Sequence, residues 1–70
     1  MTFTSKQREI LKIAKDKGFV TFEDFNSVFS SPIARKANMQ RFAALGVLVQ
    51  GTGDKFQLNS KRLEELENAK

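Results

Sequence analysis

The chain has 70 residues, which is enough for one small domain and leaves no room for a second hydrophobic core. Apolar residues make up 40% of the chain and charged residues 29%, a composition typical of a folding chain rather than a disordered one. Cysteine and histidine are both absent. Their absence excludes disulfides and the usual ligands of structural zinc, and it removes the most common catalytic base and nucleophile. We therefore expect no enzyme, no bound cofactor and no small-molecule effector.

Charge is unevenly distributed along the chain. The net charge is +4 and the pI is near 9.8, and residues 31–50 contain Arg35, Lys36 and Arg41 but no acidic residue. Such a segment favours a polyanionic partner. No apolar run approaches the roughly 20 residues that a membrane span requires, and the N-terminus lacks the pattern of a secretory signal. We therefore expect a cytoplasmic protein with no membrane partner.

A capping box marks the start of the first expected helix. Within Thr4-Ser5-Lys6-Gln7, the Thr4 hydroxyl can accept an early helical NH while Gln7 reaches back to the Thr4 backbone. Gly18 provides a stop. Apolar residues recur between these points at spacings of three and four, namely Ile10, Leu11, Ile13 and Ala14. The pattern predicts a helix from about 5 to 17, with Lys12 and Lys15 on its solvated side.

The second expected helix is short and rich in phenylalanine. Phe19-Val20 is long enough for a single β-bridge only, and Thr21 can cap a helix whose first turn carries Glu23 and Asp24. Phe22, Phe25, Val28 and Phe29 have the spacing of one buried face of a helix that ends near residue 29. This spacing predicts core packing, rather than stacking on nucleic-acid bases, for the phenylalanine cluster.

The remaining elements follow from turn and capping residues. Ser31 and Pro32 mark the start of a helix that ends at residue 45, before Gly46. Residues 47–49 and 55–59 are then expected to form a β-hairpin, joined by the turn residues 51–54. Ser60 can cap a last helix over 60–70. Its apolar stripe of Leu63, Leu66 and Ala69 can pack within the chain or across a homodimer, and both alternatives remain open.

This order of elements resembles the winged helix-turn-helix family over residues 5–59. Thr21-Phe22-Glu23-Asp24-Phe25 looks like the start of the family's second helix, Ser31-Pro32 like the beginning of its recognition helix, and residues 42–48 like the passage into its wing. The resemblance implies one domain over 1–70, mostly helical: a three-helix bundle with a two-stranded wing, followed by a short C-terminal helix. It also implies binding of double-stranded DNA by the helix 32–45 in the major groove, and a role in transcription regulation. Winged helices also serve as protein-interaction modules, which remains the alternative function.

Helical geometry divides the expected helix 32–45 into two faces. At 100° per residue, Met39, Phe42, Ala43 and Leu45 lie together on the face expected to pack on the bundle. Ile33, Lys36, Ala37, Gln40, Arg41 and Ala44 lie on the opposite face. There Gln40 can read an adenine edge, Arg41 or Lys36 can contact guanine or phosphate, and Ala37 allows close approach. The residues expected to contact DNA are Ser31, Arg35, Lys36, Ala37, Gln40 and Arg41, with Lys55 in the wing and Lys6 and Arg8 in the first helix.

Three features depart from the family's pattern. Arg35 lies beside Met39 and Phe42, where the family more often has an apolar residue, so we expect it at the edge of the core with its head group toward phosphate. The turn at residues 30–31 is short. The wing has Lys55 beside Asp54 instead of several basic residues, so one phosphate contact is the most we expect from it.

Overall fold

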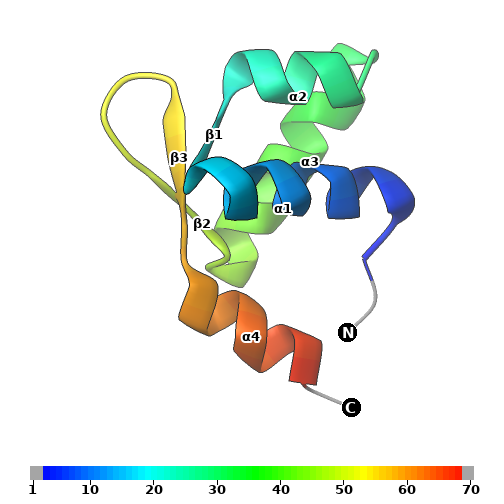
Figure 1. The fold of residues 1–70 in the computed structure, drawn as a ribbon. Coiled ribbons are helices and arrows are strands. Elements are labelled where there is room, and N and C mark those ends of the chain that lie inside the picture. Colours follow the sequence, from blue (N-terminus) through cyan, green and yellow to red (C-terminus); the bar gives the residue numbers. More distant parts are fainter. Residues whose placement is uncertain (1–2, 69–70) are drawn as a thin grey trace.

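The computed structural model describes residues 3–68, whose elements follow the expected order (Figure 1). They are α1 (Ser5–Lys17), β1 (Phe19–Thr21), α2 (Phe22–Val28), α3 (Pro32–Leu45), β2 (Leu48–Gln50), β3 (Lys55–Leu58) and α4 (Ser60–Asn68). The mostly helical fold and the predicted bounds of α1 and α3 are confirmed. Within residues 3–68, no helix is both long and apolar enough to cross a membrane. Ala69, the last residue of the predicted C-terminal stripe, lies outside the described residues.

The sheet has three antiparallel strands in the order β1-β3-β2, so the prediction of a two-stranded sheet is wrong. The predicted β2–β3 hairpin is present. The additional strand is β1, which pairs with β3 along all three of its residues and places Val20 opposite Phe56. A strand this short is stabilised by a partner about 36 residues away in the sequence, and local patterns carry no signal for such a pairing.

The core lies between the helices and the sheet, and Phe25 is at its centre. Its ring centroid is 6.2 Å from that of Phe29, 6.3 Å from that of Phe42 and 5.9 Å from that of Phe56. Core packing is therefore confirmed for Phe25 and Phe29, which are both buried. It is wrong for Phe22, which is 41% exposed. Phe22 is the first residue of α2, and its ring packs against Phe56 at the edge of the core.

The C-terminal helix α4 packs back on its own chain. Leu63 is only 2% exposed, and Leu66 is half-buried against the same core. Arg62 Nε donates a hydrogen bond of 2.8 Å to the carbonyl oxygen of Leu45, the last residue of α3. Of the two alternatives for the leucine stripe, the structure shows packing within the chain. The helix is capped by Asn59 rather than by Ser60, because Asn59 Oδ1 accepts from the backbone NH of Arg62.

Candidate nucleic-acid interface

Both ends of α3 are stabilised by local contacts. The Ser31 hydroxyl accepts a hydrogen bond of 3.4 Å from the backbone NH of Ala34, so the predicted DNA contact Ser31 is the N-cap of the helix. At the other end, Gly46 has a φ of 77°, the left-handed conformation that glycine adopts without strain. Arg62 adds its hydrogen bond to the Leu45 carbonyl at this end. The helix is therefore a well-defined platform for its exposed side chains.

A buried polar contact fixes the middle of α3 against α1. Gln7 is buried, and its Nε2 donates to Asn38 Oδ1 at 2.8 Å. Asn38 Nδ2 in turn donates to the Ala34 carbonyl at 2.7 Å, and Gln7 Oε1 accepts from the Thr4 NH. Because rotation of α3 about its axis would leave the buried Gln7 amide and the half-buried Asn38 amide unpaired, the network determines which face of α3 points outward.

Arg35 joins α3 to α2 and to the turn before it. Its Nη1 donates to Asn26 Oδ1 and its Nη2 to the Ser30 carbonyl, while its Nε is buried without a partner in the described structure. The half-buried position agrees with the expectation that Arg35 lies at the edge of the core. Any contact with DNA would be made from this bridging position between the two helices.

The predicted free face of α3 is exposed. Ile33 is 83% exposed, and Lys36, Ala37, Gln40, Arg41 and Ala44 are all exposed as well. Ala43, which was expected on the core face, is also exposed, so that prediction is wrong. Phe42 is the one fully buried residue of α3, with Met39 and Leu45 half-buried beside it, so the covered strip is narrower than expected.

The two cations of this face are available to a ligand. Within residues 3–68, neither Lys36 nor Arg41 forms an ion pair. With about 100° between successive residues, Ile33, Ala37, Gln40 and Ala44 form a central stripe, with Lys36 on one side of it and Arg41 on the other. We call these six residues the α3 face. A polyanion laid along it would meet positive charge on both sides.

Lys6 and Arg8, the two residues of α1 predicted to contact DNA, lie on different sides of that helix. Lys6 Nζ donates to the Val28 carbonyl at 3.1 Å, which places Lys6 at the C-terminal end of α2 and close to the turn before α3. Arg8 is exposed but lies two residues further along α1, so it points to a different side of that helix. The structure thus places Lys6 beside the end of α2 and Arg8 on another side of α1, and no contact within residues 3–68 groups either residue with the α3 face.

Lys55, the contact predicted in the hairpin, belongs to a cluster that the sequence did not indicate. Its Nζ lies 4.9 Å from the centroid of the Phe19 ring, and Lys17 Nζ lies 5.1 Å from the same centroid. These residues line a hollow of about 450 Å³ between the end of α1 and the hairpin. The contact positions the Lys55 ammonium beside the hollow through attraction to the ring. Phe19 and Lys55 are more than 30 residues apart in the sequence, so no local pattern predicts that they lie together.

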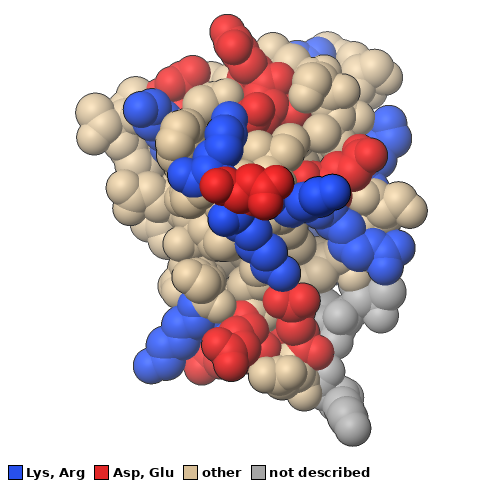
Figure 2. Space-filling view, in the orientation of Figure 1, with Lys and Arg blue, Asp and Glu red and all other residues tan. Residues whose placement is uncertain are grey.

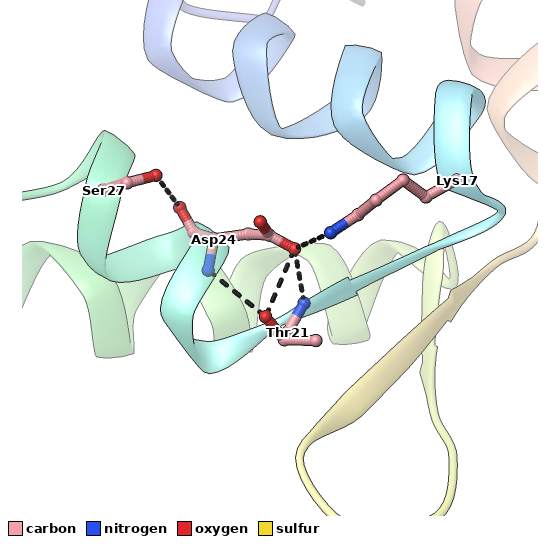
Figure 3. Close-up of polar contacts among 4 residues, drawn as sticks. All are labelled: Lys17, Thr21, Asp24 and Ser27. Atoms are coloured by element: carbon pink, nitrogen blue, oxygen red, sulfur yellow. Dashed lines mark hydrogen bonds and ion pairs between the residues drawn. The ribbon is translucent and has the colours of Figure 1, made fainter.

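Asp24 connects the start of α2 to the end of α1 (Figure 3). Its Oδ2 accepts hydrogen bonds from Lys17 Nζ and from the Thr21 NH, both at 2.9 Å, and the Thr21 hydroxyl accepts from the Asp24 NH. The expected Thr21 cap is thus a complete capping box. Burial alone would raise the pKa of Asp24, but the hydrogen bonds from Lys17 and Thr21 outweigh it and hold that pKa below the usual value of 3.8.

We expect Asp24→Asn to destabilise the domain by roughly 1 kcal/mol at pH 7, because it removes the charge that faces Lys17 and the helix dipole. A carboxylate with a lowered pKa in the folded state stabilises the fold above its unfolded-state pKa and loses that contribution as pH falls through the folded-state value. Urea denaturation from pH 7 to pH 2 should therefore show the difference fading below about pH 4. Glu23→Gln, in the same helical turn, is the control and should leave the Lys17 contact intact. A difference that persists at pH 2 would contradict the assignment.

The side of the molecule formed by α1 is mixed in charge. Figure 2 shows basic and acidic atoms interspersed over its centre, while acidic atoms gather over α4 at the lower end. Lys15 pairs with Glu67 at 3.6 Å and Arg62 with Glu65 at 3.5 Å. This side therefore differs from the α3 face, which contains two cations and no acid.

Comparison of the chain with protein-family models, with curated proteins and with solved structures finds no match. Its function must therefore be inferred from the chemistry of its own surface.

Proposed function

We propose that the chain is a winged helix-turn-helix domain that binds double-stranded DNA with α3 in the major groove, as a small transcriptional regulator or another DNA-associated protein. The observation that carries the proposal is the α3 face. Its six residues are exposed, Lys36 and Arg41 form no ion pair with any residue that the structure describes, and residues 31–50 contain no acidic residue. The order of three helices followed by a hairpin supports it. A helix of this kind fits the major groove, which is about 12 Å wide.

We also propose flanking contacts with the phosphate backbone from α1 and the hairpin. Lys6 lies at the C-terminal end of α2, and Lys55 lies in the hairpin beside Phe19. With Lys36 and Arg41 they provide four cations for the phosphate backbone, distributed over α1, α3 and the hairpin. Backbone contacts of this type set orientation and affinity, while side chains such as Gln40 read base edges.

The test is fluorescence anisotropy of a labelled random-sequence duplex titrated with the full chain at 50 and 200 mM salt. We expect micromolar or tighter binding at the lower concentration. If about four phosphates are neutralised, counterion release predicts a loss of affinity of roughly 100-fold between the two conditions. Absence of binding at 50 mM salt would overturn the proposal.

The alternative function is a protein-interaction module, and one observation favours it. A groove of about 440 Å³ lies between α2 and α3 and is lined by the exposed Phe22 together with Met39, Lys36 and Gln40. Its apolar lining and basic edge suit an acidic protein segment that carries one apolar side chain. This function takes first place if the duplex titration shows no binding.

A further inference from the structure

Within residues 3–68, the most exposed large apolar side chain lies on the face proposed to meet DNA. Ile33 is 83% exposed in the first turn of α3, compared with 41% for Phe22 and 51% for Val49. It lies opposite the buried Phe42, so no core contact explains it. Isolated apolar residues on a surface are common and need no explanation, but this one lies in a particular setting.

Ile33 belongs to a small, nearly apolar stripe on α3 that lies between two cations. Ile33, Ala37 and Ala44 share the stripe with Gln40, and Lys36 and Arg41 flank it at roughly 60° and 80° around the helix from Ile33. If the flanking cations contact phosphates on the two walls of a groove, the stripe faces the base edges between them. Its side chains then meet the floor of the major groove rather than water.

The side chains of the stripe are complementary to particular groups on the base edges. In the major groove the one apolar group on any base edge is the 5-methyl of thymine, and apolar side chains contact it. Gln40 offers the amide that pairs in a bidentate manner with adenine. Ile33 and Gln40 are separated by seven residues, a rise of about 10 Å along the helix, which corresponds to about three base pairs.

We propose that Ile33 is a specificity-determining residue that reads a thymine methyl, and that the α3 face therefore prefers A·T pairs at its centre. This inference rests on the proposed DNA binding. We assign Ile33 to DNA contact rather than to protein contact. The cations on both sides of it and the lack of acidic residues in 31–50 are complementary to a polyanion. The protein-interaction alternative assigns no role to the methyl group of a base.

The test compares two duplexes built only of A·T pairs in mixed order, one with thymine and one with deoxyuridine, which lacks only the 5-methyl group. We expect the wild type to bind the thymine duplex about fourfold more tightly for each methyl that is buried. Ile33→Ala should bind both duplexes equally, and Ile33→Val should retain part of the preference. Lys36→Ala should weaken binding to both duplexes and leave their ratio unchanged. Circular dichroism should show that all three variants stay folded, since both residues are exposed.

The outcomes separate this inference from the proposed function. Equal, salt-dependent binding of the wild type to both duplexes would overturn thymine reading and leave DNA binding in place. A preference for thymine that persists in Ile33→Ala would show that another residue contacts the thymine methyl, and it would also overturn the inference. No binding to either duplex would overturn the proposed function itself.

Discussion

Phe25→Ala is expected to remove a large part of the free energy of unfolding of the domain. The ring of Phe25 contacts those of Phe29, Phe42 and Phe56, so it joins α2 to α3 and to the sheet. Removal of a buried phenylalanine costs about 3–5 kcal/mol, because the lost burial is compounded by a cavity that the surroundings only partly fill. A domain of 70 residues has a total free energy of unfolding of roughly 4–10 kcal/mol. The loss is therefore roughly a third or more of the whole stability.

The measurement is thermal denaturation followed by far-ultraviolet circular dichroism. We expect a fall in Tm of more than about 15 °C for Phe25→Ala. Phe22→Ala is the matched control, because Phe22 belongs to the same helix but is 41% exposed. Among the aromatic rings of residues 3–68, its ring packs against that of Phe56 alone. It should cost about 1 kcal/mol. Similar losses in the two variants would show that Phe25 is not the centre of the core.

The helices were predictable because their ends depend on local chemistry. The Thr4–Gln7 capping box and the left-handed Gly46 act within a few residues of the backbone groups that they satisfy. Such interactions are present in any context that allows the helix to form, so sequence spacing alone locates them. The exposed side of α3 was also predictable, since Phe42 and Met39 determine its buried side through the helical repeat.

Features that depend on packing between elements were not predictable. The pairing of β1 with β3 brings Val20 opposite Phe56, which requires the hairpin to lie beside α1. The contacts of Arg35 with Asn26 and of Lys6 with the Val28 carbonyl depend on the angles between helices. A single sequence contains the residues for such contacts but not the distances between them. The candidate site was therefore predicted as a face of exposed residues, without the bridging roles of Arg35 and Lys6.

Lys36→Ala and Arg41→Ala are each expected to weaken duplex binding by about tenfold at low salt, because each removes a charged hydrogen-bond donor from the interface. Each should also lower the slope of log Kd against log salt by about one unit. Neither residue forms an ion pair within residues 3–68, so the substitutions should leave the free energy of unfolding almost unchanged. Anisotropy titrations at four salt concentrations measure both the affinity and the slope.

Lys12→Ala is the matched control for these variants, since it removes the same charge from an exposed position on α1, outside the α3 face. If binding reflects only the net charge of +4, all three substitutions should weaken it equally. If the α3 face contacts the phosphates, Lys12→Ala should keep the wild-type slope while the other two lose a unit each. An equal effect of the three variants would contradict the assignment of the contact surface to α3. Diffuse electrostatic attraction depends on net charge and does not distinguish one exposed cation from another.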